Sequence, residues 1–265
     1  MNGALYKYEM KSSMKLLIIF AAIMTMYVSI IIGMYDPKMM NMLDEFAKAM
    51  PEIMAAVGMN ISTTSLLGFM VSYLYGFILI VFPMVFCIVR GNGLIAKYVD
   101  KGSMVSLMAA PMKRSKIVIT QMMVLISGVV LLIGYVTILE YCVAQSYFPN
   151  EIGKSELWKL NIGLLCLHLC IASIIFLASC VCSDTKYSVG FGAGIPAVMY
   201  IMKMLANVGG KAENAKYFTM FTLFDPEGII SGKEGAMIGS SILLIVAIIM
   251  FGLSVYIFDR KDLSI

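Results

Sequence analysis

Charged residues are scarce in this sequence of 265 residues. They make up 14% of the chain, and hydrophobic residues make up 60%. An average soluble domain carries about 25% charged residues, so this composition excludes an ordinary soluble domain. Apolar runs of about 20 residues suffice to cross a bilayer, and the chain has six. They cover residues 16–35, 65–89, 117–146, 160–182, 189–208 and 236–258. The sequence therefore predicts an all-α integral membrane protein with one transmembrane domain over residues 1–265.

Sequence motifs of membrane enzymes and of nucleotide binding are also lacking. There is no Gly-x-Ser-x-Gly nucleophile motif, no His-Glu-x-x-His zinc motif and no pair of carboxylates inside a span. The Gly-x-x-x-x-Gly-Lys-Ser/Thr loop is missing, so we expect that this chain does not bind ATP through such a loop. None of the six cysteines falls in a predicted outer loop, and we expect no disulfide. The sequence predicts no catalytic residue, metal site or cofactor in this chain.

Three polar residues inside the spans are candidates for a cargo path or gate. His168, the single histidine, lies about 13 Å below the outer end of its span. Glu140 lies late in the third span, near the outer interface, and Lys203 in the outer half of the fifth could pair with it or extend its ammonium group outward to the interface. Polar groups at such depths either serve function or form buried hydrogen bonds and ion pairs, and the sequence leaves both readings open.

Basic residues concentrate between the second and third spans, in residues 90–116. Their excess over the single acid Asp100 predicts that this loop is cytosolic, and both termini with it. The net charge of +4 therefore reflects membrane topology and does not indicate nucleic-acid binding. The basic residues of this loop are Arg90, Lys97, Lys101, Lys113, Arg114 and Lys116.

A short amphipathic helix is predicted inside this basic loop. Ser103 can cap it, and it ends before Pro111 because proline disrupts a helix interior. Met104, Leu107 and Met108 then share one face. A small apolar face at the cytosolic surface suggests a contact for another protein.

Segments outside the spans carry three further expectations. Residues 1–15 form an amphipathic helix whose basic stripe lies among inner-leaflet headgroups, or else a frayed tail. Residues 36–64 form interfacial helices that act as a lid or as a structural cap. The apolar stretch 217–230 is too short to cross and is predicted to dip into the outer leaflet as a re-entrant hairpin.

Glycine spacing in the fifth span predicts a close helix contact. Gly190 and Gly194 stand at the Gly-x-x-x-Gly spacing that lets two helices approach. Packing within the subunit is the default expectation, and pairing with a second copy is the alternative.

The loop also carries a family resemblance. Asp100-Lys-Gly102-Ser103, Leu107-Met108 and Pro111-Met-Lys-Arg114 resemble the E-x-G-T…L-L-x-x-P-x-x-R pattern of ABC type-2 permeases. These are six-span membrane subunits of ATP-driven exporters. Asp100 replaces the usual Glu, and Gln121 stands where Lys is common. The segments 6–11, 217–225, 229–232 and 258–263 are similar to the family's elbow helix, outer segment and C-terminal end, so the resemblance spans the full length.

The resemblance implies a mechanical function. The short helix would be a coupling helix that docks on a separate ATPase subunit, which holds ATP and Mg. Two copies of the chain would pair, through spans 2 and 5, above two ATPase subunits. The closest type is the small Gram-positive permeases that export antimicrobial or amphipathic peptides, which implies a bacterial plasma membrane, contact with its lipids and a hydrophobic cargo. The residues assigned to coupling are Asp100, Gly102, Ser103, Met104, Leu107, Met108, Pro111 and Arg114.

Two other classes of function remain open. One is a channel or secondary transporter that works without an ATPase. It is disfavoured because the sequence has no obvious inverted repeat and no charged pathway at the midplane. The other is an intramembrane enzyme that uses His168 and Glu140. Their predicted depths differ by about 10 Å along the membrane normal, which disfavours a shared active site.

Overall fold

The chain folds into a bundle of long helices. The computed structural model describes residues 1–36, 50, 65–108, 113–233 and 235–261, and all regular structure within these ranges is helical. Six helical stretches there are long and apolar enough to cross a membrane, which confirms the predicted spans. They are α1 (Gly3–Gly33), the stretch Leu66–Asp100, α8 (Arg114–Tyr147), α9 (Lys154–Val181), α10 (Thr185–Val208) and α12 (Ala236–Arg260).

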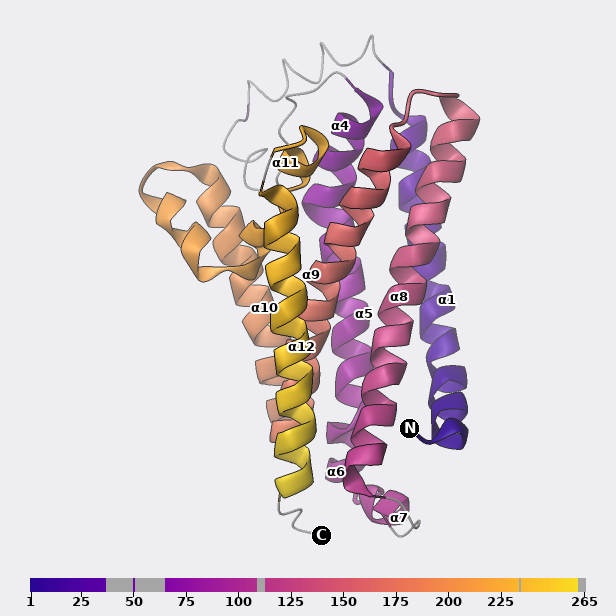
Figure 1. Ribbon diagram of the computed structural model, residues 1–265, viewed down its shortest axis with the longest axis vertical. Coiled ribbons are helices and arrows are strands. Elements are labelled where there is room, and N and C mark those ends of the chain that lie inside the picture. Colours follow the sequence, from indigo (N-terminus) through magenta and orange to yellow (C-terminus); the bar gives the residue numbers. More distant parts are fainter. Residues whose placement is uncertain (37–49, 51–64, 109–112, 234, 262–265) are drawn as a thin grey trace.

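Helix α9 forms the centre of the bundle (Figure 1). It packs against α5 (Leu79–Leu94), α8, α10 and α12, and α1 packs along α8. Buried residues occur on every side of α9, as expected for a helix that is apolar all round. By contrast, α10 and α12 leave most of their apolar side chains exposed on the outside of the bundle.

The two ends of the bundle are different. Figure 1 places the N-terminus, α6 (Ala96–Asp100), α7 (Met104–Met108) and the last turn of α12 at one end. At the opposite end are α4 (Leu66–Met70) and α11 (Pro226–Ile230). The segments that we predicted to be cytosolic thus share one end.

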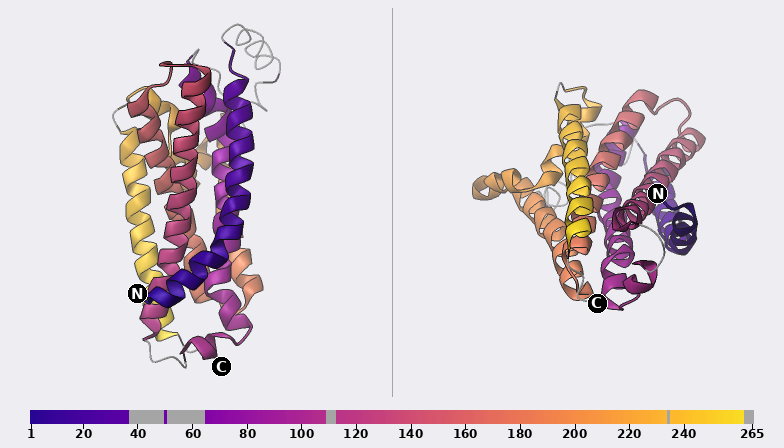
Figure 2. Two further views of the ribbon diagram at one scale, coloured as in Figure 1. Left: turned by 90° about the vertical axis from the view of Figure 1, so that its right-hand side faces the viewer. Right: turned by 60° about the horizontal axis from the view of Figure 1, so that its bottom comes forward.

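The first helix is longer than predicted. Residues 1–15 and the first span form one unbroken helix, α1, and Figure 2 shows its N-terminal part bending away from the rest. The Asn2 side chain caps this helix by accepting hydrogen bonds from the backbone N–H groups of Ala4 and Leu5. The Tyr6 hydroxyl donates to Ser127 of α8 (2.9 Å), so the lead-in is docked on the bundle.

The second span also extends further than predicted. After α4 the chain forms a π-helix, η1 (Val71–Ile78), and continues into α5, with Pro83 inside it, and then α6. Our expectation of a loop beginning at Arg90 is therefore wrong, because Arg90 lies within α5. Basic side chains are good helix formers. The helical run ends at Asp100, and the turn after it contains Gly102, whose φ of +68° glycine adopts without strain.

The stretch before the last span folds as a series of short turns. It comprises the 3-10 helices η2 (Gly210–Phe218) and η3 (Met220–Leu223), followed by α11. Phe221 and Phe224 are buried, and η3 contacts α10 and α12. Tyr217 and Phe218 of the same stretch are exposed, at 76% and 69%. The predicted dip of this stretch into the outer leaflet stays a prediction. The helices predicted for residues 36–64 lie almost wholly outside the described residues.

Candidate functional site

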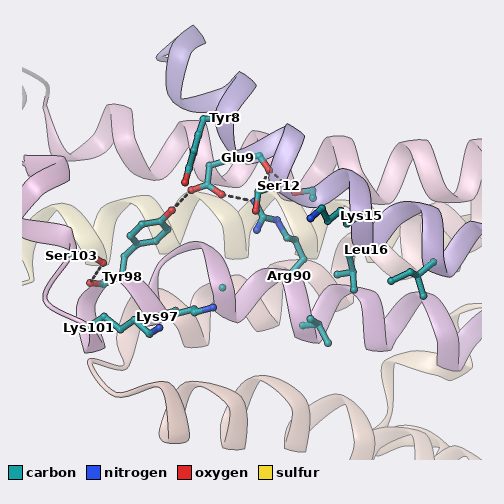
Figure 3. Close-up of a pocket in the computed structure, with 14 residues that line it drawn as sticks. Tyr8, Glu9, Ser12, Lys15, Leu16, Arg90, Lys97, Tyr98, Lys101 and Ser103 are labelled. Carbon is teal, nitrogen blue, oxygen red and sulfur yellow. Dashed lines mark hydrogen bonds and ion pairs between the residues drawn. The ribbon is translucent and has the colours of Figure 1, made fainter.

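The carboxylate of Glu9 joins four helices at the end of the bundle that carries α6 and α7. Glu9 is only 2% exposed. Arg90 of α5 places Nη2 2.6 Å from Glu9 Oε2, and the same nitrogen donates to the Glu9 carbonyl. The Tyr98 hydroxyl of α6 donates to Oε1 (2.6 Å), and Nε2 of Gln121 in α8 donates to the same oxygen (3.2 Å). Figure 3 shows Arg90 and Tyr98 converging on Glu9.

Sequence reasoning missed Glu9, although a signal was present. Lys7, Lys11 and Lys15 mark the basic stripe of the lead-in, and Glu9 is about 200° around the helix from Lys7 and Lys11. It is in register with the buried residues Ser13 and Leu17 of α1. An acid on the apolar face of a helix predicts a buried partner, because an unpaired buried charge is costly.

The five-residue helix α6 is bonded to three different membrane helices. Tyr98 reaches Glu9 of α1, as described. The backbone N–H of Ala96 donates to the Ser179 hydroxyl of α9 (2.9 Å). Asp100 accepts a hydrogen bond from the Thr185 hydroxyl at the start of α10 (2.8 Å). Movement of α6 would therefore be transmitted to α1, α9 and α10 at the same time through these hydrogen bonds.

The short helix α7 exists, but Met104 and Leu107, the described part of its expected apolar face, turn toward the bundle. Met104 is 2% exposed, and Leu107 is partly buried against the core. Val105 is 43% exposed and is, among the described side chains of α7, the apolar one most open to a partner. Our prediction of Met104 as part of an exposed docking face is therefore wrong, since its burial helps hold α7 to the bundle. Pro111 and the Met108 side chain lie outside the description.

The polar residues around α7 have structural partners within the chain. The Ser103 hydroxyl donates to the Tyr98 carbonyl (3.3 Å), which closes the turn before α7 where we had expected a helix cap. Arg114 at the start of α8 donates to the Lys261 carbonyl (3.1 Å). Lys261 in turn donates to the Cys180 carbonyl (3.1 Å). These bonds tie the ends of α8, α9 and α12 together.

Glu140 is buried in a polar contact between helices. It is fully buried, and its Oε2 accepts hydrogen bonds from the Tyr75 hydroxyl (2.7 Å) and from Nδ2 of Asn161 (2.8 Å). The expected pairing with Lys203 is not among the ion pairs of the described residues, which are Arg90–Glu9 and Lys216–Glu213. Packing rotates Glu140 toward η1 and α9, so the predicted pair does not form.

Lys203 belongs to a separate hollow. It lines a cavity of about 220 Å³ together with Asn207, Asp225 and Glu227. Tyr75 also lines this cavity, and its hydroxyl donates to Glu140. Tyr75 thus contacts Glu140 and also lines the cavity that Lys203 lines.

His168 links α9 to the second span through backbone atoms. It is fully buried, with Nδ1 2.9 Å from the Leu164 carbonyl and Nε2 3.2 Å from the Ile80 carbonyl. His168 follows Asn161, the partner of Glu140, by seven residues along α9, or roughly 10 Å. The structure therefore does not bring His168 and Glu140 together. Within the described ranges, no three His, Cys, Asp or Glu side chains group closely enough to hold a metal ion.

The glycine pair of α10 does not pack within the subunit. A Cβ at Gly190 or Gly194 would meet nothing within 4 Å. Gly192 makes the close approach instead, because a Cβ there would lie 3.4 Å from the Ile175 Cα of α9. The default expectation for Gly190 and Gly194 is wrong, and their face of α10 is open.

Comparison of this chain with family models, with curated proteins and with solved structures finds no match. The fold alone therefore defines the class: an all-helical, multi-pass protein whose six long apolar helices have the length and composition of membrane spans.

Proposed function

We propose that this chain is the permease subunit of an ATP-driven exporter, with ATP and Mg bound by a separate ATPase subunit. The observation that carries the proposal is the position of α6. It precedes the short helix α7 in the chain and is hydrogen-bonded to α1, α9 and α10. A push on α6 and α7 would reach three membrane helices through three bonds, which is what a coupling element requires.

The surface available to the ATPase is small and partly apolar. Val105 is exposed on α7, and Lys97 and Lys101 are exposed on α6 and the turn after it. An exposed valine near lysines would fit a shallow apolar pocket on the ATPase that is bordered by acidic residues. The buried Met104 serves this contact only indirectly, because it anchors α7.

The transported cargo in this proposal is amphipathic or hydrophobic, most naturally a peptide. This rests on the family resemblance. The open apolar face of α10 is where a second copy would pair, with the cargo path between the two copies. The chain would lie in a bacterial plasma membrane with both termini in the cytoplasm, and it would catalyse no covalent change itself.

Copurification tests this proposal. The tagged chain is solubilised from host membranes in mild detergent, and an ATPase subunit is expected among the proteins that copurify. In proteoliposomes the complex should hydrolyse ATP and move amphipathic peptides. Transport without any ATPase would instead favour a channel or secondary transporter and would contradict the proposal.

A valine substitution then tests the contact itself. Val105→Asp should abolish copurification or ATP-dependent transport while the permease remains monodisperse. Val181→Asp is the matched control, because Val181 is 48% exposed at the end of α9 and lies outside α6 and α7. If Val105→Asp retains full binding and coupling, α7 is not the docking element.

A further inference from the structure

A cavity of about 470 Å³ opens beside the Glu9 cluster, between the lead-in of α1 and the end of the second span. Four cationic side chains line it, against one carboxylate, that of Glu9. Figure 3 shows them arriving from two directions, Lys15 from α1 and the others from α5, α6 and the turn after α6. The four are Lys15, Arg90, Lys97 and Lys101.

The single carboxylate leaves the lysines uncompensated. Glu9 is already bonded to Arg90, Tyr98 and Gln121. Among the described residues, neither Lys15, Lys97 nor Lys101 takes part in an ion pair. Three ammonium groups around one cavity favour an anion there, because like charges held near one another repel unless a counter-charge is bound.

A hydroxyl group adds a hydrogen-bond donor to the same cavity. Ser12 of α1 lines it, whereas the hydroxyls of Ser13 and Ser103, which also line it, donate to the Glu9 and Tyr98 carbonyls. Phosphate oxygens accept hydrogen bonds from both ammonium and hydroxyl donors, and they carry the charge that the lysines require.

The other wall of the cavity is apolar. Leu16, Ile19 and Val89 form it, and Ile19 and Val89 are 55% and 53% exposed. Leu16 begins the first apolar run of the sequence and Val89 ends the second. The cavity therefore lies at the level where both helices change from polar to apolar, which is the level of lipid headgroups.

We infer that this cavity binds the phosphate headgroup of an anionic phospholipid, with the acyl chains lying on Leu16, Ile19 and Val89. A soluble phosphate compound would meet the same lysines but would leave the apolar wall unused. The site shares Lys97 and Lys101 with the surface proposed for the ATPase, but lipid binding requires only that α1 and the second span lie in a bilayer, and it is measured without an ATPase.

Native mass spectrometry of the detergent-purified full chain measures this binding directly. Phosphatidylglycerol, which is anionic, is titrated against phosphatidylcholine, which has no net charge. The Lys15→Gln/Lys97→Gln/Lys101→Gln variant should bind phosphatidylglycerol on the order of tenfold or more weakly. The matched control is Lys7→Gln/Lys11→Gln/Lys186→Gln, which removes three exposed lysines outside the cavity. Equal loss in both variants, or no preference for phosphatidylglycerol, would overturn the inference.

A second variant fills the space without removing charge. Gly93 lines the cavity, and a Cβ there meets nothing within 4 Å. Leucine is a better helix former than glycine, so Gly93→Leu should fold normally and still weaken phosphatidylglycerol binding. Unchanged binding by a folded Gly93→Leu protein would exclude this cavity as the lipid site.

Inorganic phosphate separates the two possible sources of the anion. At millimolar concentration it should displace bound phosphatidylglycerol only weakly, because it cannot use the apolar wall. Complete displacement would assign the cavity to a soluble phosphate compound and overturn the lipid assignment.

Discussion

Arg90 and Glu9 form a buried ion pair of 2.6 Å between the second span and the lead-in of the first. Their side chains are 12% and 2% exposed. The same Arg90 nitrogen donates to the Glu9 carbonyl, so the arginine holds both the side chain and the backbone of α1. These contacts fix the start of α1 against the end of α5. The second carboxylate oxygen of Glu9 accepts the hydrogen bond from Tyr98 of α6.

Removing one member of this pair should destabilise the protein strongly. Arg90→Met leaves Glu9 charged and without its cation, which typically costs about 3–5 kcal/mol. Thermal unfolding in detergent, followed by circular dichroism, should show a clearly lowered midpoint. The Glu9→Met/Arg90→Met double variant should regain part of the loss, because no buried charge is then left alone, although Tyr98 and Gln121 lose their acceptor. A double variant as unstable as the single one would contradict this account.

Glu140 should act as an acceptor that joins three helices. Glu140→Leu leaves the buried Tyr75 hydroxyl and the Asn161 amide without this partner, at a cost of about 1–3 kcal/mol for each group. Glu140→Gln keeps a carbonyl oxygen in place and should lose less. Comparing the unfolding midpoints of the two variants checks this order. Equal midpoints would mean that the hydrogen bonds to Glu140 contribute little.

His168 should prove structural. Both ring nitrogens face backbone carbonyls, at Leu164 and Ile80. We therefore expect His168→Ala to lower the unfolding midpoint by the equivalent of roughly 1–3 kcal/mol, from lost packing and one lost hydrogen bond. Transport per folded molecule should stay near that of the natural chain, and so should that of His168→Asn. Loss of transport in both variants at normal stability would place His168 in the cargo path.

Leucine substitution at two glycines of α10 should change the stability of the protein by different amounts. Gly192→Leu must displace α9, so overpacking should cost about 1–3 kcal/mol. A Cβ at Gly190 meets nothing within 4 Å among the described residues, so Gly190→Leu should leave the unfolding midpoint unchanged. Light scattering of detergent complexes then reports whether Gly190→Leu disrupts a pair of chains. A strong fall in the stability of a Gly190→Leu monomer would contradict the open face described for α10.

The six helices were predictable because each depends on its own stretch of sequence. An apolar run of bilayer length such as 236–258 has one economical structure, a helix that satisfies its own backbone. Helix ends were less predictable. Arg90 looked like the start of a loop because its charge was taken as a boundary, whereas the backbone continues as helix to Asp100.

The polar contacts were predicted less well. Glu140 and Lys203 were expected to pair because both appeared close to the outer interface. Pairing also depends on the direction in which each side chain leaves its helix, and that direction follows from how the helices rotate and pack. Tyr75 donates to the carboxylate of Glu140 and lines the cavity of Lys203, and no pattern in the sequence indicates this.

The sequence by itself determined the all-helical class, the number of spans and the presence of a short helix between the second and third spans. These follow from local composition and from the need to satisfy backbone hydrogen bonds in an apolar medium. Only the tertiary structure decided that Glu9 lies under Arg90 and Tyr98, that Met104 turns inward and that Gly192 makes the close contact in place of Gly190. The physical reason is that these contacts join residues distant in sequence, and their geometry exists only once the helices have packed.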